Sequence, residues 1–404
     1  MKKSVILPTD TQFPSKHLTI LVFLISSTLA WFFLLQTYFH TIFVHIIAEI
    51  VWIKFGLIIF WTFGAFSAIL GSVISERIKR RRMIVAWLTL ATGITAALAM
   101  FQGLFFLFLS TMLLGFSLGF GFPSSVATFA DFTKIEQRAR IAGIIILVAF
   151  ALTFLGMIII SITGSNLLVI IIYLVFLRAT GFISLAVNFS SKKRGQEKSL
   201  SSIATNPKFA AYLVPWVLFN VAAGMLAWGN ISTIPGYASA HSLAFPIAAI
   251  SGLVAGILAD RFGRRQPIMI SLISFGFSFA ILSFIVISLS LYIYYVTYGI
   301  AWGFLLAIYL TIPGDLSSTG SREKFYALGT VTPLIVYISL SALPDLFNFE
   351  VAIDAIAPIL SIVLFLSVIP ILRAEETLTE SKQRKRRMKE YLERLGKVIE
   401  EETN

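Results

Sequence analysis

Long apolar runs recur along almost the whole chain, separated by short polar or charged stretches. Each run is close to the roughly 20 residues that an α-helix needs to cross the hydrocarbon core of a bilayer. The stretch 42–74 is too long for one span, and its first part carries His45, Glu49 and Lys54, so that part is expected at the outer surface. The pattern predicts about twelve transmembrane helices, at Leu18–Phe39, Val51–Ile74, Met83–Phe101, Leu104–Ser125, Ile141–Ile162, Leu167–Phe189, Ala210–Asn230, Leu243–Ala259, Ile268–Ser288, Tyr292–Pro313, Phe325–Leu343 and Ala355–Leu372.

The composition agrees with a membrane protein and limits its chemistry. Of 404 residues, 57% are hydrophobic and only 13% are charged, whereas a soluble domain carries about 25% charged residues. The chain has no cysteine, which excludes a disulfide framework and a thiolate metal site. The polar stretch 1–16 does not have the pattern of a cleaved signal peptide, because the apolar run after it is too long and no small-residue cleavage site follows.

Basic residues gather on one side of this topology. Of the 32 lysines and arginines, only Lys54 is expected outside and Arg178 within the membrane, so the other 30 (32 − 2) fall at the N-terminus, the even-numbered loops and the C-terminus. The positive-inside rule therefore predicts a multi-pass protein of the cell membrane with both termini in the cytoplasm. The net charge of +12 reflects this topology, and no nucleic-acid partner is expected.

A repeated charge pattern divides the chain into two related halves. The stretch 72–81 aligns with 256–265 at an offset of 184 (260 − 76), and Asp131 aligns with Asp315 at the same offset (315 − 131). Each aspartate is followed seven residues later by an arginine, Arg138 or Arg322. Such repeats are typical of transporters built from duplicated bundles. The expected organisation is a cytoplasmic N-terminus (1–17), a six-helix bundle (18–189), a cytoplasmic linker (190–208), a second six-helix bundle (209–372) and a charged cytoplasmic tail (373–404).

The loop between two of these spans, Gly256–Arg265, reads G-I-L-A-D-R-F-G-R-R. It resembles the loop signature G-x-x-x-D-R-x-G-R-R of the major facilitator superfamily, and every position matches. The resemblance covers 18–372 and implies an all-α membrane protein of two pseudo-symmetric six-helix bundles around a central cavity that opens alternately to each side. The first half departs from the pattern at Ser72, Glu76 and Lys79, so its turn is expected to be looser.

Charged residues of these loops are expected to form a cytoplasmic latch. An acid that pairs with arginines of its own and neighbouring loops makes charge-assisted hydrogen bonds, and their size of a few kcal/mol suits a reversible switch. A simpler interpretation is that the basic residues only hold the loops in the cytoplasm, but that role needs neither Asp260 nor the glycines. The residues assigned to gating are Asp260, Arg261, Gly263, Arg264, Arg265, Asp315 and Arg322 in the second half, and Glu76, Arg77, Arg80, Arg81, Asp131 and Arg138 in the first.

The membrane interior is poor in ionisable groups, so aromatic and polar residues are the main candidates for substrate binding. Neither aspartate nor glutamate falls in the middle of an expected span, and all four histidines fall near span ends. Arg178 either binds an anionic substrate group or has a structural role, pairing with backbone carbonyls or extending to the interface. The substrate-binding candidates are Gln36, Arg178, Asn220, Trp228, Tyr298 and Trp302. The rival interpretation of such tryptophans and tyrosines is an interfacial aromatic belt.

These features predict a secondary transporter for a small organic solute, working as a facilitator or exchanger of a sugar-like or organic anion substrate without obligatory proton movement. The alternative is a non-transporting membrane sensor or assembly protein that retains the fold. An intramembrane enzyme is not expected, because the spans offer no nucleophile, metal ligands or paired acids. No cofactor or metal is expected, and the partners are the solute and the lipid bilayer, with the chain a monomer. The tail, with apolar residues at helical spacing from Met388 to Ile399, either lies on anionic headgroups or is solvated.

Overall fold

The computed structural model describes residues 15–75, 77–100, 102–186, 198–225, 234–284, 288–318, 320–347 and 353–378, together with Met388. Two residues expected at functional sites, Glu76 and Trp228, lie outside the described residues. So do residues 190–197 of the linker 190–208 and the tail after Leu378 apart from Met388.

The described chain is built from helices connected by short loops. The first half contains α1 (Ser15–Thr37), α2 (Phe39–Val44), α3 (Ile50–Ile74), α4 (Arg80–Ala97), the 3-10 helix η1 (Leu98–Met100), α5 (Leu104–Gly119), α6 (Phe122–Phe132), α7 (Arg138–Ile162), α8 (Leu167–Thr180) and the 3-10 helix η2 (Gly181–Ala186). The second half contains α9 (Leu200–Ala204), α10 (Pro207–Met225), α11 (Tyr237–Phe262), α12 (Arg265–Phe284), α13 (Ser288–Tyr309), α14 (Ile312–Leu316), α15 (Arg322–Phe347), α16 (Ile353–Leu366) and α17 (Val368–Arg373). Among the described residues, twelve helical stretches are long and apolar enough to cross a membrane, which confirms the number expected from the apolar runs.

Several of these spans consist of more than one helical element, and in two of them a second α-helix begins with a proline, which the apolar pattern does not indicate. The span Leu104–Phe132 consists of α5 followed by α6, and the span Leu289–Leu316 consists mainly of α13 followed by α14. A proline stands in the first two positions of both α6 and α14, where it loses no helical hydrogen bond and its fixed φ suits a helix start. The expected ends of these spans, at Ser125 and Pro313, are therefore too early.

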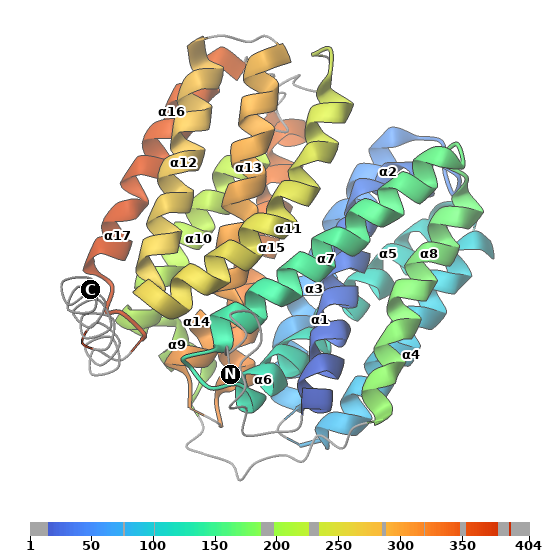
Figure 1. Cartoon of the computed structure of the whole chain (residues 1–404). Coiled ribbons are helices and arrows are strands. Elements are labelled where there is room, and N and C mark those ends of the chain that lie inside the picture. The colour runs from blue at the N-terminus through green and yellow to red at the C-terminus, as the bar shows by residue number, and fades with distance from the viewer. Residues whose placement is uncertain are drawn as a thin grey trace, which may run out of the picture.

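The two halves form two bundles, which meet mainly along two pairs of helices (Figure 1). Across the interface α7 contacts α11, and α3 contacts α15. We call the face at which α1 begins and α17 ends the terminus face, and the opposite face the far face. Each bundle has its own apolar core, and a further core is shared where α7 crosses α11, with Ile146 and Ala249 among its buried residues.

Glycines allow the backbones of α7 and α11 to touch at this crossing. A Cβ atom added to Gly256 would lie 2.3 Å from the carbonyl oxygen of Ala139, and one added to Gly143 would lie 2.7 Å from that of Gly252. A side chain at these positions would therefore separate the bundles. The first glycine of the signature loop thus serves helix contact. Gly263, at φ 103°, takes the positive-φ backbone of the turn itself.

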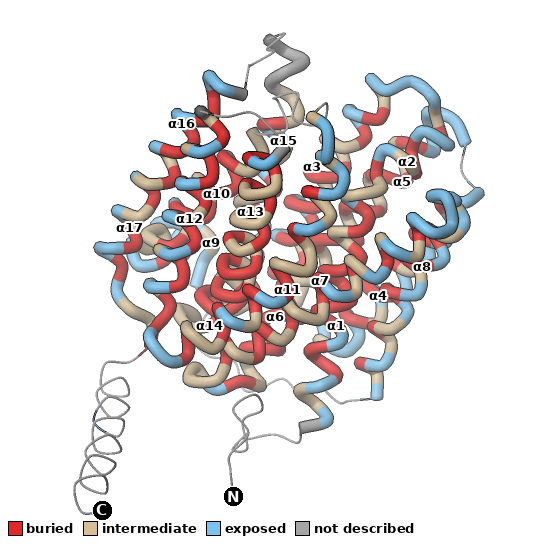
Figure 2. Tube along the Cα trace, turned by 45° about the horizontal axis from the view of Figure 1, so that its top comes forward, coloured by how far each residue is buried: buried red, intermediate tan, exposed pale blue. Residues whose placement is uncertain are grey.

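The outward surfaces of both bundles are apolar. Figure 2 shows exposed positions along the outer helix faces and buried positions between the helices. Large apolar side chains are exposed there, among them Phe23, Ile172, Phe277 and Ile359. Such a surface suits a lipid environment, in which the helices satisfy their own backbone hydrogen bonds.

Candidate functional site

Charged residues close the terminus face between the two bundles. We call this set the polar closure, and it has two arms related by the sequence offset of 184. The equivalent pairs are Arg80 with Arg264 (264 − 80), Asp131 with Asp315, and Arg138 with Arg322. In the structure, each aspartate is held by one arginine of its own half and one of the other half. The arms therefore cross the interface in opposite directions.

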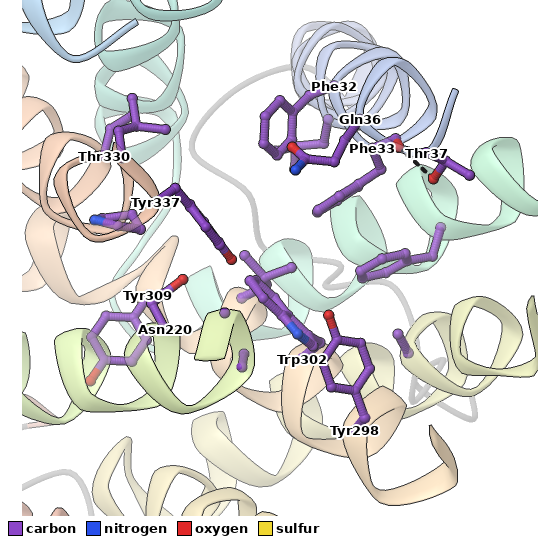
Figure 3. A pocket seen from close by; sticks show the side chains of 18 of the residues that line it. Phe32, Phe33, Gln36, Thr37, Asn220, Tyr298, Trp302, Tyr309, Thr330 and Tyr337 are labelled. Carbon is purple, nitrogen blue, oxygen red and sulfur yellow. Dashed lines mark hydrogen bonds between the residues drawn. The ribbon is translucent and has the colours of Figure 1, made fainter. Parts of the chain in front are cut away.

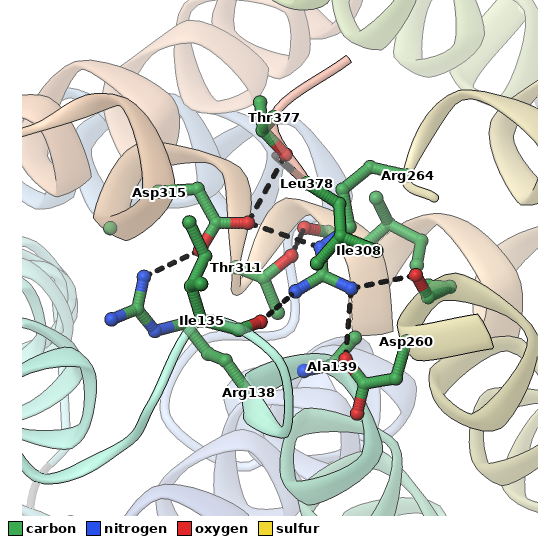
Figure 4. A network of polar contacts seen from close by, with 12 residues as sticks. Ile135, Arg138, Ala139, Asp260, Arg264, Ile308, Thr311, Asp315, Thr377 and Leu378 are labelled. Atoms are coloured by element: carbon green, nitrogen blue, oxygen red, sulfur yellow. Dashed lines mark hydrogen bonds and ion pairs between the residues drawn. The ribbon is translucent and has the colours of Figure 1, made fainter. Parts of the chain in front are cut away.

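The first arm, which Figure 4 draws, is the more buried one by its exposed fractions. Arg138 Nη1 donates to Asp315 Oδ1 across the interface at 2.5 Å, and Arg264 Nε donates to Asp315 Oδ2 at 3.1 Å within the second bundle. The side chains of Asp315 and Arg264 are 0% exposed and that of Arg138 is 4% exposed. Arg138 is also fixed within its own bundle, because its Nη2 donates to the carbonyl oxygens of Ala130 and Thr133. The contact to Asp315 therefore joins two rigidly placed groups.

The second arm contains the equivalent pairs with the roles of the two bundles exchanged. Arg80 Nη1 donates to Asp131 Oδ2 at 2.5 Å within the first bundle, and Arg322 pairs with Asp131 Oδ1 from the second bundle. Arg80 also donates from Nε to Glu323 Oε1 at 2.9 Å, a second contact across the interface. Glu323 was not expected in the latch, although it directly follows Arg322 in the sequence. The breaks between α5 and α6 and between α13 and α14 place the two aspartates in this layer.

Asp260 crosses the interface by capping a helix. Its Oδ1 accepts from the backbone N–H of Ala139 at 3.2 Å and its Oδ2 from that of Arg140 at 2.9 Å. These amides belong to the first turn of α7, whose own N-cap residue, Gln137, provides no side-chain cap. A carboxylate there satisfies free N–H groups and meets the positive end of the helix dipole. Asp260 thus also connects the bundles through backbone, beyond the arginine pairing expected from the sequence.

Arg264 ties Asp260 to the rest of the closure. Its Nη1 donates to Asp260 Oδ1 at 2.8 Å, and its Nη2 donates to the carbonyl oxygen of Ile135 across the interface at 2.6 Å. Burial acts to lower the pKa of this guanidinium, but Asp315 and Asp260 outweigh that effect and hold the pKa above its ordinary value. Arg264 therefore stays charged in the closed arrangement.

The segment after α17 folds onto the same loop. Glu376 accepts hydrogen bonds from the backbone N–H groups of Arg264 and Arg265, at 2.8 and 3.2 Å. Thr377 Oγ1 donates to Asp315 Oδ2 at 3.2 Å, and the side chain of Leu378 is buried. These contacts lie within the second bundle, so they brace the closure without crossing the interface.

The other basic residues assigned to gating have different partners. Arg265 Nε donates to the carbonyl oxygen of Ile371 at the end of α17, and Arg81 Nη2 donates to that of Leu185 in η2. Arg261 lies over the ring of Phe262, and Arg77 is exposed. The structure therefore brings together Asp260, Arg264, Asp315, Arg322, Arg80, Asp131 and Arg138, with Gly263 at the turn.

A cavity of about 930 Å³ lies between the bundles on the far side of the closure. Pro313, two residues before Asp315, lines it near the closure, whereas Thr37 and Lys54 line it near the far face. Figure 3 shows Phe32, Phe33 and Gln36 of α1 facing Tyr298 and Trp302 of α13, with Asn220 and Tyr337 beside them. The first bundle thus contributes mainly apolar rings, and the second contributes aromatic groups with polar atoms.

Several buried polar atoms at this cavity have no hydrogen-bond partner within the described part of the chain. Asn220 and Tyr294 are 0% exposed, yet Asn220 Oδ1, the Tyr294 hydroxyl and Trp302 Nε1 make no hydrogen bond to any described residue. The amide nitrogen of Asn220 is used, since it donates to the Trp216 carbonyl oxygen at 2.7 Å. An unpaired buried polar atom costs about 1–3 kcal/mol, so a ligand that supplies the missing partners would bind favourably.

The cavity unites most of the substrate-binding candidates. Gln36, Asn220, Tyr298 and Trp302 line it, and Arg178 does not. The lining also includes Lys54, expected at the outer surface, and His241, expected only near a span end. His241 stacks on Tyr237, with ring centroids 5.7 Å apart. The spacing of polar residues along one face of a span does not indicate Lys54 and His241, because both reach the cavity from positions near the start of a helix.

Arg178 lies one side chain behind the cavity wall, in the last turn of α8. Its guanidinium carbon lies 3.8 Å from the ring centroid of Trp31 and 5.3 Å from that of Trp87. Its Nη1 donates to Thr28 Oγ1 and its Nη2 to the carbonyl oxygen of Ser117, each at 3.4 Å. Of these residues, Thr28 lines the cavity.

Comparison with known proteins agrees with this architecture. The structure resembles a bacterial homologue of the iron transporter ferroportin in the outward-facing state, with TM-score 0.67 and 15% identity over 89% of this chain and 98% of that one. It also resembles the human organic anion transporter MFSD10 (TETRAN), with TM-score 0.66, 14% identity and coverage of 89% and 100%. A third similar structure is the proton:xylose symporter XylE, with TM-score 0.66, 12% identity and coverage of 90% and 97%. No curated protein sequence matches this chain. The family model of the Major Facilitator Superfamily matches residues 17–338, which is more than half of the chain, and the protein therefore belongs to this family of membrane transporters.

Proposed function

We propose that this chain is a secondary transporter that moves a small organic solute by alternating access. The observation that carries the proposal is a cavity with unpaired polar atoms above a closure made of separable polar contacts. Opening the terminus face requires the contacts of Arg138, Arg322 and Asp260 across the interface to break. Water can hydrate the freed groups, so the two conformers can lie close in free energy.

We place both termini in the cytoplasm of a cell-membrane protein, because Lys and Arg gather in the loops of the terminus face. In that orientation the described conformer is closed to the cytoplasm, and its cavity faces outward. The similarity to a ferroportin homologue in the outward-facing state supports this assignment.

The lining favours an amphipathic organic solute with hydrogen-bonding groups. Phe32 and Phe33 offer apolar surface on one wall, and Asn220, Tyr294 and Trp302 offer unpaired polar atoms on the other. Such walls suit a sugar-like molecule or an organic anion. Two structurally similar proteins carry solutes of these kinds by name, a xylose symporter and an organic anion transporter.

We further propose a facilitator or exchanger mechanism without obligatory proton movement. Among the described residues that line the cavity there is neither aspartate nor glutamate, and proton-coupled carriers generally need a protonatable group on the path. Among the described lining residues, His241 is the only histidine, which makes it the first residue to test for this role.

Solute counterflow into proteoliposomes tests the transport proposal. Vesicles loaded with an unlabelled sugar or carboxylate should accumulate the labelled compound, and Asn220→Leu should reduce that exchange, because it removes the unpaired carbonyl inside the cavity. Ser283→Ala, a helix residue that does not line the cavity, serves as the control. Saturable ligand binding without any flux would instead favour a sensor that retains the fold.

A further inference from the structure

Aromatic rings form a continuous row on the second bundle's side of the cavity. Tyr294, Tyr298 and Trp302 of α13 follow each other four residues apart, so they lie on one face of that helix. The ring centroids are 5.8 Å apart between Tyr294 and Tyr298, and 6.0 Å apart between Tyr298 and Trp302. Tyr298 and Trp302 line the cavity and are only partly buried. Part of each of these two rings is therefore free to contact a solute.

The opposite wall, which belongs to the first bundle, is aromatic as well. The ring centroids of Phe32 and Phe33 of α1 are 5.3 Å apart, and that of Phe32 lies 5.8 Å from that of Trp61 of α3. Phe32 and Phe33 are partly buried lining residues, and Figure 3 shows them across the cavity from Tyr298 and Trp302. A solute in the cavity thus has aromatic surface on two opposite sides.

The two walls touch at their flanks but not between them. On the flank where α3 meets α15, Trp61 stacks on Tyr337, with ring centroids 5.2 Å apart and an interplanar angle of 25°. On the flank where α7 meets α11, the ring centroids of Phe150 and Phe245 are 6.1 Å apart. Among the described residues no ring contact joins α1 to α13. The cavity is therefore a slot between aromatic walls, closed by ring contacts on both flanks.

An unpaired acceptor lies beside this slot. Asn220 lines the cavity one turn after Trp216, whose ring centroid is 6.0 Å from that of Trp302. The Asn220 amide nitrogen donates to the Trp216 carbonyl oxygen, so the orientation of the amide is fixed and Oδ1 remains as an acceptor without a described partner. The hydroxyl of Tyr294 is also unpaired and can donate or accept. A fitting solute therefore needs at least one hydrogen-bond donor.

We propose that the solute binds through a flat heteroaromatic ring, which enters the slot between α1 and α13 and donates a ring N–H to Asn220 Oδ1. This inference rests on the proposed transport function and narrows its organic solutes to those with such a ring. Stacking and edge contacts between aromatic rings stabilise the faces of the solute. Its N–H lies in the ring plane, so it can reach Asn220 while the faces stay apolar. A sugar ring carries hydroxyls around its whole rim, and most of them would face aromatic walls unpaired.

Matched ligands test flatness and the N–H separately on the purified full chain. A neutral set consists of quinolinone, its N-methyl derivative and its fully saturated lactam, which keeps the N–H but is not flat. A carboxylate set consists of indole acetate, its N-methyl derivative and cyclohexylacetate. In each set the flat N–H compound should give half-maximal thermal stabilisation at a concentration at least fivefold lower than the other members. Equal or tighter binding of a saturated member, or no stabilisation by either flat N–H compound, would overturn the inference.

Variants of the two walls separate ring contact from general apolar packing. Phe32→Leu and Tyr298→Leu should each weaken binding of the tighter flat compound fivefold or more, whereas Phe32→Tyr and Tyr298→Phe, which keep a ring, should retain most of it. The matched controls Phe23→Leu on α1 and Tyr292→Leu on α13 do not line the cavity and should have no effect. Unchanged affinity in both Phe32→Leu and Tyr298→Leu would refute the proposal. Because these residues belong to different bundles, one variant keeps the test decisive if the other does not fold.

Asn220→Leu isolates the N–H contact. The preference for the N–H compound over its N-methyl derivative should disappear in this variant, while the preference for flat over saturated compounds should remain. A general loss of packing would weaken all members alike and leave their ratios unchanged. An unchanged N–H preference would refute the role of Asn220.

Flux measurements distinguish this inference from the transport proposal. Binding of flat N–H compounds without counterflow would refute transport while leaving the ring site intact. Counterflow of xylose or glucuronate, undiminished in Phe32→Leu and Tyr298→Leu, would support transport and refute the ring assignment.

Discussion

Asp260→Asn should open the terminus face, because it removes a carboxylate that joins the two bundles. In the closed conformer its two oxygens accept from the N–H groups of Ala139 and Arg140 and from Arg264 Nη1. These three groups are all hydrogen-bond donors. Asparagine keeps one side-chain oxygen that can accept a hydrogen bond. Its amide nitrogen is a donor, however, and would face one of these N–H donors without forming a hydrogen bond.

The size of the effect follows from which of these bonds cross the interface. The bond to Arg264 lies within the second bundle, so its loss weakens both conformers alike. The bonds to α7 exist only when the face is closed. Losing one hydrogen bond to a charged acceptor costs about 1.5–3 kcal/mol, which raises the open fraction roughly tenfold to 150-fold while that fraction remains small.

Distances between spin labels report this population directly. The chain has no cysteine, so labels can be placed at Ile78 and Phe262, which are 43% and 46% exposed at the terminus face. The long-distance population should rise in Asp260→Asn. Glu376→Gln is the matched control, because Glu376 also accepts two loop amides but within one bundle. An unchanged distribution in Asp260→Asn, or an equal shift in Glu376→Gln, would refute the reasoning.

Three other features give direct tests. Gly256→Ala should lower the stability of the conformer with the closed terminus face by about 1–3 kcal/mol through overpacking against Ala139. Gly93→Ala, where a Cβ meets nothing within 4 Å, should be neutral or slightly stabilising. Equal melting temperatures of the two variants would contradict the close crossing. A cysteine at the exposed Ser165 should react with an impermeant maleimide on intact cells and one at the exposed Ser199 only after permeabilisation, and the reverse result would invert the topology. Uptake should not respond to an imposed pH gradient; a response that disappears in His241→Gln or Glu49→Gln would establish proton coupling.

The apolar runs predict the spans well because each span must be long and apolar to cross the bilayer. They do not show where a span bends, since the residues around Gly121 and Thr311 are as apolar as the rest. Pro123 and Pro313 were the available signals, because a proline inside an apolar run often begins a new helix. Because both prolines lie at or near the expected ends of their spans, neither of them alone indicates a break within a span.

The polar closure could be predicted as a set of residues but not as a set of pairs. The offset of 184 relates Asp131 to Asp315 and Arg138 to Arg322. This symmetry does not decide whether each arginine pairs with the aspartate of its own half or with that of the other half. Only the packing between the bundles, of α7 against α11 and of α6 against α15, shows that each of these arginines reaches the aspartate of the opposite half. Glu323 was missed because its partner, Arg80, lies far away in the sequence.

The number of ion pairs in the closure does not lock it, because opening returns these groups to water. Buried ion pairs gain Coulomb energy but lose hydration, so their net contribution is small when both partners can be rehydrated. This applies to Arg138 and Asp315, which are 4% and 0% exposed in the closed conformer, and also to the Asp260 carboxylate, which is 0% exposed. The difference lies in the partners of Asp260 across the interface, since backbone N–H groups in the first turn of α7 donate to it and such groups gain less from water than a charged guanidinium does. The arginine pairs therefore mainly align the two bundles, and the Asp260 cap contributes a larger share of the preference for the closed face.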